Sequence, residues 1–415
     1  MTTWSLIFVI IWIVFLLVFV KKSLQIAILA FVLVRQSLFS VPSLIFIVNG
    51  GYINEQNVYG HDNGAIIIYV FHIIYSLLLI YILFKYLHIE TIYPGFKIGR
   101  FKIENQIILI AIGVLTILII NLALSPIPLF NSEVDRFDYF RSSKFPFLRT
   151  ILGDVASFVP FIFGIYFTKK RKPAIILFSV YMIYIVLIGQ KFGPLISSIT
   201  YFFIPFICMH DFKIKYRSLF KVQYLLIPAA IFGVVYYSYS VYNPYKHVVG
   251  DSVVAAIFYR LLGLQSHVWW GSVEHFVYMG KPPSYQIMEL ADGMRHMMSL
   301  LAPFDVSLNY QRGVSFTNAY PGILLKVFPY HLAFVFNTLM IVKLTLMIKL
   351  LVAFIKSKNY LLSIILFQAY IWFIYMLSMG TFARFWITTA VLLVLLMMVK
   401  VKLFVKKPEL IIFGN

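Results

Sequence analysis

Residues 3–22 read TWSLIFVIIWIVFLLVFVKK, an apolar run that ends in two lysines. Such a run is long enough to cross the hydrocarbon core of a bilayer, which takes about 20 residues of helix. No small-residue cleavage site follows it, so it predicts a spanning helix and not a signal peptide. The same pattern recurs along the chain and predicts an all-α, polytopic membrane protein.

Composition favours the same class. Of the 415 residues, 61% are hydrophobic and 12% are charged, whereas soluble domains are about half apolar and a quarter charged. The formal net charge of +20 could suggest a nucleic-acid partner, but in a membrane protein the placement of the cations matters more than their total. We therefore expect no nucleic acid. The single cysteine, Cys208, excludes an internal disulfide and a thiolate metal cage.

The apolar runs predict eleven transmembrane helices. They cover residues 3–20, 24–48, 65–84, 106–124, 149–168, 174–188, 194–209, 222–239, 331–355, 360–378 and 385–399. Every odd-numbered helix is followed by a basic cluster, and these clusters hold more than half of the 35 lysines and arginines. Because cytoplasmic connections carry the excess of basic residues, we expect a periplasmic N-terminus and a cytoplasmic C-terminus.

Three regions follow from this topology. Helices one to eight occupy residues 1–239, a large periplasmic loop occupies 240–330, and the last three helices with a cytoplasmic tail occupy 331–415. Within the loop, residues 251–279 read as one helix capped by Asp251 and Ser252, and residues 284–301 read as a second helix.

Cations on the outer side oppose the usual charge bias, so we take them as candidates for binding an anionic substrate. Those selected are Lys191, Arg312, Arg384, Arg136, Arg141 and Arg295. The alternative for each is snorkelling towards lipid headgroups. Lys191 fits this alternative least, because its turn divides an apolar run that is barely long enough to cross twice. A cation at that depth normally faces a cavity or a ligand.

Arg260, His267 and Glu274 recur every seven residues on the predicted helix 251–279. A heptad drifts by only about 20° per repeat on a straight helix, so the three side chains would share one stripe. A cation, a neutral proton carrier and a carboxylate in line suit phosphate binding with proton transfer, which makes them our catalytic candidates. A solvated polar face is the alternative.

Two further features lie in the same loop. Trp269 and Trp270 could stack on a sugar ring, or they could anchor the loop at the membrane surface. Thr317 or Asn318 is expected to cap a short helix that begins near Pro321, and the free end of that helix would suit an anion.

Signals for metal or cofactor chemistry are weak. Glu133 and Asp135 resemble the paired acids of metal-dependent membrane glycosyltransferases, but an internal salt-bridge network explains them equally well. The sequence has no phosphate-binding glycine loop, no His-Glu-x-x-His and no Gly-x-Ser-x-Gly. We therefore expect neither a metal nor a cofactor.

In architecture the chain resembles the O-antigen polymerases (Wzy type), which are themselves similar to the O-antigen ligases. The resemblance includes about eleven helices, a large outer loop in the second half, and outer arginines. Locally, residues 187–195 (LIGQKFGPL) resemble the family's Gly-x-Arg-x-Gly turn with Lys191 in place of arginine, and residues 316–322 (FTNAYPG) resemble the segment that re-enters the membrane. Lysine holds a phosphate as a point charge, without the bidentate geometry of arginine.

The resemblance implies a metal-independent glycosyltransferase on the periplasmic face of the bacterial inner membrane. It would polymerise undecaprenyl-diphosphate-linked oligosaccharide repeat units, with membrane lipid and a chain-length regulator protein as further partners. Arg260, Lys191, Arg312 and Arg384 would hold the diphosphate, Arg136 and Arg141 would support the donor or acceptor, and His267 or Glu274 would be the base. A lipid-linked oligosaccharide flippase and an O-antigen ligase remain the alternatives.

Overall fold

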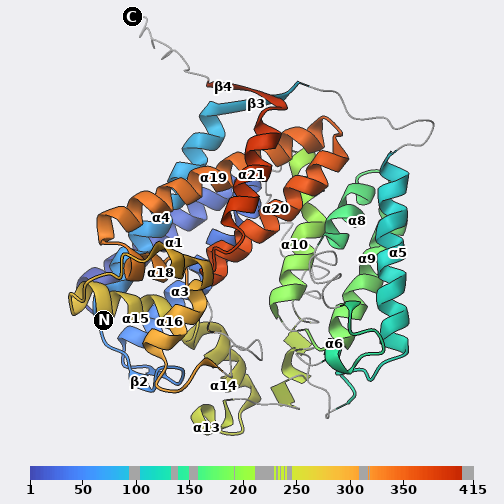
Figure 1. Cartoon of the computed structure of the whole chain (residues 1–415). Coiled ribbons are helices and arrows are strands. Elements are labelled where there is room, and N and C mark those ends of the chain that lie inside the picture. Colours follow the sequence, from blue (N-terminus) through green and yellow to red (C-terminus); the bar gives the residue numbers. More distant parts are fainter. Residues whose placement is uncertain are drawn as a thin grey trace, which may run out of the picture.

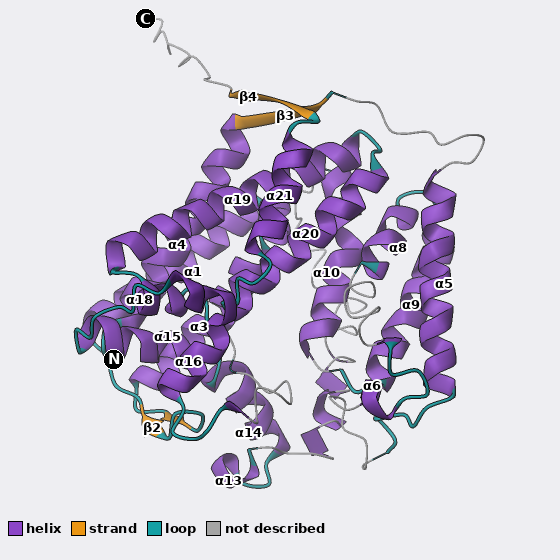
Figure 2. Ribbon diagram, in the orientation of Figure 1, coloured by secondary structure: helices purple, strands orange, loops and turns teal. Residues whose placement is uncertain are grey.

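The computed structural model describes residues 1–92, 103–131, 139–148, 158–190, 192–210, 229, 232–233, 235–237, 239–240, 245–307, 316 and 318–403. Helices make up most of this part, and its strands form two small sheets of two strands each (Figure 2). The structure therefore has the all-α architecture that the apolar runs predict.

Long apolar helices form the body of the molecule (Figure 1). Within the described residues, six helices are long and apolar enough to cross a membrane. These are α1 (Thr3–Lys22), α3 (Phe31–Val48), α4 (Ala65–Tyr86), α5 (Ile103–Ala123), α19 (Tyr330–Lys356) and α20 (Tyr360–Met379). Large apolar side chains on them, such as Leu17 and Leu109, remain more than half exposed, as helices that contact lipid require.

Shorter helices complete the body. They are α2 (Leu24–Leu29), α6 (Tyr139–Ser142), α8 (Val159–Phe167), α9 (Arg171–Leu187), α10 (Phe192–Met209) and α21 (Phe385–Leu396). Helix α8 packs against α5, α9 and α10. Its Phe161 stacks on Phe367 of α20, with ring centroids 3.8 Å apart, and this contact joins the α5–α10 group to the rest of the bundle.

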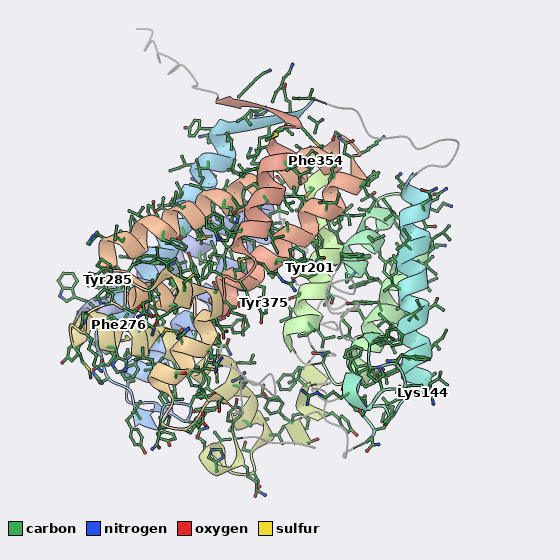
Figure 3. The ribbon with its side chains drawn as sticks, viewed as in Figure 1. Lys144, Tyr201, Phe276, Tyr285, Phe354 and Tyr375 are labelled. Carbon is green, nitrogen blue, oxygen red and sulfur yellow. The ribbon has the colours of Figure 1, made fainter. Side chains whose placement is uncertain are left out.

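In its described residues, the long segment between α10 and α19 carries short helices. They are α13 (Lys246–Val249), α14 (Val253–Phe258), α15 (His267–Val273), α16 (Gly293–Leu301) and α18 (Gly322–Val327). Phe276 and Tyr285 of this segment lie far from Phe354, which is near the C-terminal end of α19 (Figure 3). The described helices of the segment therefore lie at one end of the bundle.

Several basic connections meet at the opposite end. Strand β3 (Leu87–Thr91), which follows α4, pairs antiparallel with β4 (Val399–Leu403), which follows α21. An ion pair of 3.1 Å joins Lys402 to Glu90 across these strands. A second basic connection contacts α20: the ammonium of Lys169, which follows α8, lies 5.1 Å from the ring centroid of Tyr360, at the start of α20.

The N-terminus lies with the connection between α3 and α4. The Thr2 amide donates to Asp62 Oδ2 at 2.7 Å, and the terminal ammonium donates to Asn49 Oδ1 at 3.3 Å. In this connection β1 (Tyr52–Ile53) and β2 (Val58–Tyr59) form a small hairpin. Figure 1 shows the N-terminus beside this hairpin and the C-terminus at the far end.

Some predicted helix bounds are wrong. The helix expected over 24–48 is broken at Ala30 into α2 and α3. The helix expected over 385–399 ends at Leu396, because the β-branched residues that follow pair in β4. The helix expected over 284–301 is a 3₁₀ turn, Ile287–Asp292, followed by α16.

Two predicted spans are described only in part. Within the range 149–168, the described residues begin at 158, and α8 starts at Val159. Most of the range 222–239 lies outside the described residues. The count of eleven spans therefore stays a prediction.

Candidate functional site

The connection between α3 and α4, residues 49–64, lies along the helices of the long segment. Gln56 donates its side-chain amide to the carbonyl of His267 at 2.8 Å. Trp270 Nε1 donates to the carbonyl of His61 at 2.9 Å. These bonds join two parts of the chain that are about two hundred residues apart. The site is therefore built by the connection 49–64 and by the segment that contains α15, which the sequence analysis treats separately.

The expected single helix over 251–279 is wrong. Residues 253–263 form one helix, capped as expected by the hydroxyl of Ser252, and it ends in a π-helical turn, Tyr259–Gly263. A break at 264–266 follows, and the second helix, α15, passes into another π turn, Glu274–Tyr278. A π turn places one extra residue in each turn, so a spacing of seven no longer keeps side chains on one face.

Arg260 pairs with Glu55, which belongs to the connection 49–64 between α3 and α4. Its Nη1 lies 3.5 Å from Glu55 Oε1, and its guanidinium also hydrogen-bonds to Tyr245. Burial raises the pKa of Glu55 to about 7, against the opposing effect of the Arg260 charge. The other oxygen, Glu55 Oε2, is buried and has no hydrogen-bond partner among the described residues. This carboxyl can therefore gain or lose a proton near neutral pH.

His267 is completely buried. Its Nδ1 donates to the carbonyl of Leu264 at 2.7 Å, so the ring carries its proton there. Nε2 has no partner in the described part of the chain, and Phe316 closes over the ring edge-on at 4.8 Å. Burial, with a smaller effect of the Arg260 charge, lowers the pKa of His267 to about 4. The ring is shut away from solvent.

Glu274 is also buried, and it contacts the connection 49–64. Its Oε2 lies 3.1 Å from His61 Nε2 and accepts a bond of 2.9 Å from the side-chain amide of Asn63. Arg260, His267 and Glu274 therefore contact three different sets of partners and form no single stripe.

Both tryptophans beside the expected stripe are buried. Trp269 Nε1 donates to the carbonyl of Ala65, the first residue of α4, at 3.0 Å. With the bond from Trp270 to His61, the two indoles fix residues 61–65 against α15. They are anchors, and with 4% of each residue exposed they offer little surface for stacking on a sugar.

Asn318 does not cap the following helix. Pro321 occupies the N-cap position of α18 without a side-chain cap, and Thr317 lies outside the described residues. The amide of Asn318 donates instead to the carbonyl of Gln265 at 3.0 Å, and Gln265 donates to the carbonyl of Arg260 at 2.7 Å. The segment before α18 thus supports the break that follows Arg260.

The other predicted cations occupy separate positions. Arg384 is exposed and stacks over the ring of Trp372 at 4.6 Å. Arg295, on α16, and Arg141, on α6, are also exposed. The turn before Arg384 touches the segment that carries Arg295, since the Phe382 amide donates to the carbonyl of Leu290 at 2.7 Å. Lys191, Arg312 and Arg136 lie outside the described residues, so the predicted convergence of all these cations on one cavity stays a prediction.

An apolar pocket lies next to these loops, between α4, α18 and α19. Its lining is Ile68, Phe71, His72, Trp269, Pro321, Leu324, Leu325, Tyr330, Ala333, Phe334 and Asn337. Phe71 and Tyr330 are about half exposed, so the pocket borders the outer wall of two candidate membrane spans. Trp269 of α15 lines this pocket and bonds to Ala65 of α4, and its neighbour Trp270 bonds to His61.

Three residues of the site were missed by sequence analysis: Glu55, His61 and Asn63. Their only signal is that a polar stretch, NEQNVYGHDNG at 54–64, stands between two spans. Among the described residues, no group of three histidine, cysteine or acidic side chains could hold a metal ion. Glu133 and Asp135, the metal candidates of the sequence, are outside that part.

Comparisons with known proteins give one match. Residues 288–395 match a family of unknown function (DUF6418), over a range that runs from the 3₁₀ turn before α16 into α21. No curated protein matches the chain, and no solved structure matches it.

Proposed function

We propose that this protein is a glycosyltransferase that extends a lipid-diphosphate-linked glycan, as its resemblance to the O-antigen polymerases implies. The observation that supports it most is the Arg260–Glu55 pair. A guanidinium is held in a partly buried site by a carboxyl whose pKa is about 7. A diphosphate can displace Glu55 from the guanidinium at a low cost in free energy, because the carboxyl of Glu55 takes up a proton when it leaves.

The apolar pocket supports the choice of a lipid-linked substrate. It borders candidate spans α4 and α19, and Trp269, which lines it, precedes Trp270, whose indole donates to the carbonyl of His61 in the polar loop. In our proposal an isoprenoid chain lies along this wall while its diphosphate reaches the loops. Arg260 then stabilises the negative charge that develops on the leaving lipid diphosphate, a role that requires a fixed cation in a site with little water.

The transfer breaks one bond and forms another. An acceptor hydroxyl oxygen attacks the anomeric carbon of the donor glycan, and the bond from that carbon to the lipid diphosphate breaks. The diphosphate leaves with the electron pair, and a base on the protein takes the hydroxyl proton.

Orientation is part of the proposal. The ends of α4 and α21, joined by β3 and β4, carry lysines, and the turn after α8 with Lys169 lies beside the start of α20. Basic connections normally face the cytoplasm. We therefore place this end in the cytoplasm, and residues 49–64 with the long segment in the periplasm of a bacterial inner membrane.

A deletion strain tests the function. The surface glycan of the strain, separated on a gel, should collapse from a ladder to a single repeat. Loss of a ligase would instead leave long polymer on the lipid carrier, and loss of a flippase would leave no repeat transferred at all. An unchanged ladder contradicts the proposal.

Complementation with variants tests the site. Arg260→Ala should give single repeats only, whereas Arg260→Lys should keep short chains because a point charge remains. Lys246→Ala is the matched control: Lys246 is a cation of the same segment, but its pair with Asp251 is fully on the surface. Immunoblots of the membrane fraction must show equal protein in all strains.

A further inference from the structure

His61 and Glu274 form a histidine–carboxylate pair between the two loops. His61 Nε2 lies 3.1 Å from Glu274 Oε2, and the side chain of Glu274 is 9% exposed while that of His61 is 48% exposed. Because Glu274 accepts the Nε2 proton, the neutral imidazole presents Nδ1 as an acceptor. Among the described residues nothing bonds to that Nδ1.

The imidazole is held in place on several sides. Asn63 donates to the same oxygen of Glu274 at 2.9 Å and so fixes the carboxylate. The rings of Trp270 and Tyr278 meet the imidazole edge-on, with centroids 5.4 Å and 5.7 Å away. Trp270 also holds the carbonyl of His61. The carboxylate is thus the orienting group, and the imidazole is the group that solvent or a substrate can reach.

Such a pair is the arrangement that activates a hydroxyl group in many enzymes. A buried carboxylate selects the tautomer and stabilises the imidazolium, and the free nitrogen takes the proton. His267 cannot do this in the described structure, because its ring is completely buried. His61 has both the exposure and the fixed orientation that a general base needs.

We infer that His61 is the general base for the acceptor hydroxyl and that Glu274 is its positioning residue. The inference rests on the proposed glycosyl transfer. The acceptor is a carbohydrate, and the ring of Tyr278, 64% exposed beside the imidazole, offers a face on which a sugar ring can pack. The hydroxyl proton passes to His61 Nδ1 as the oxygen bonds to the anomeric carbon, and the imidazolium is stabilised by Glu274.

The experiment uses the full chain, purified and reconstituted, with a synthetic lipid-diphosphate oligosaccharide as donor and acceptor. His61→Ala should lower turnover about 100-fold or more, the usual size of a lost general base. Glu274→Gln should also lower it about 100-fold or more, because the amide no longer selects the correct tautomer of the imidazole or stabilises the imidazolium. His247→Ala, which removes an exposed imidazole of the same segment bonded to Asn54 at 2.9 Å, should keep full turnover.

Chemical rescue separates a base from a structural anchor. Added imidazole should restore part of the turnover of His61→Ala, while pyrazole, a ring of the same size and much lower basicity, should not. Full turnover of His61→Ala, or a loss accompanied by a lower melting temperature and no rescue by imidazole, overturns the inference. Absence of transfer by the wild-type chain would instead contradict the proposed function itself.

Discussion

The guanidinium of Arg260 lies 3.5 Å from the carboxylate of Glu55, between the connection that follows α3 and the segment that precedes α19. The pair is mostly buried, and the second oxygen of Glu55 has no partner in the described residues. A buried carboxylate without its full set of hydrogen bonds is costly in free energy. This cost is the source of the raised pKa of Glu55 and of the first prediction.

Stability should depend on the protonation of Glu55. Its pKa is raised from 4.5 to about 7 by burial, so folding favours the protonated form. The stabilisation that the protonated Glu55 contributes to the folded state is fully present below about pH 4.5 and is lost as the pH rises through 7. It amounts to at most about 3 kcal/mol in the free energy of unfolding. The melting temperature of the wild-type chain in detergent should therefore fall between about pH 5 and pH 8 more steeply than that of Glu55→Gln.

The control for this experiment is Glu90→Gln, which removes an exposed acid paired with Lys402. Its melting temperature should follow that of the wild-type chain over the same range. Parallel curves for the wild-type chain and Glu55→Gln would show that Glu55 is ionised throughout.

Gly293 should tolerate no side chain. A Cβ at this position would lie 2.1 Å from the carbonyl oxygen of Gly380, which belongs to the turn before Arg384. Gly293→Ala must push α16 away from this turn, at a cost of about 1–3 kcal/mol, and should lower the melting temperature. Gly113→Ala, in α5, meets open space and should leave the stability unchanged or higher. Equal effects of the two changes would contradict the contact.

The ammonium of Lys343 should stabilise the start of α21 within the bundle. It donates to Thr388 Oγ1 at 2.8 Å, to Thr389 Oγ1 at 2.6 Å and to the carbonyl of Phe385 at 3.2 Å. Lys343→Met loses these three bonds, so we expect a loss of about 1–3 kcal/mol in thermal unfolding. The control is Lys349→Met, whose ammonium lies over the ring of Phe84 at 4.0 Å. A smaller loss for Lys343→Met than for Lys349→Met would reject this role.

Cysteine labelling tests the orientation. The native Cys208 is buried, so a single introduced cysteine can be followed over a low background. Tyr59→Cys, at an exposed position of the hairpin, should react with an impermeant maleimide on intact spheroplasts. Lys402→Cys, on β4 at the opposite end, should react only after the membrane is opened. The reverse pattern would place the candidate site in the cytoplasm.

The apolar runs alone determine where most long helices lie. The runs that contain α1, α4, α19 and α20 predict their helices to within about two residues at each end, because burial in lipid needs an unbroken apolar stretch whatever the neighbours are. The bounds fail where a contact with another part of the chain competes with the helix, as at Val399, which leaves α21 to pair in β4.

The site was decided by tertiary structure. Sequence spacing selected Arg260 and Glu274, but their partners, Glu55 and His61, stand in a loop about two hundred residues earlier. No periodic pattern in the sequence indicates such a contact, because the contact depends on how two distant segments fold over the ends of different helices. The break before His267 bonds to Ser40 and Ser43 of α3, and with the π turns it separates the three side chains that a straight helix would have aligned.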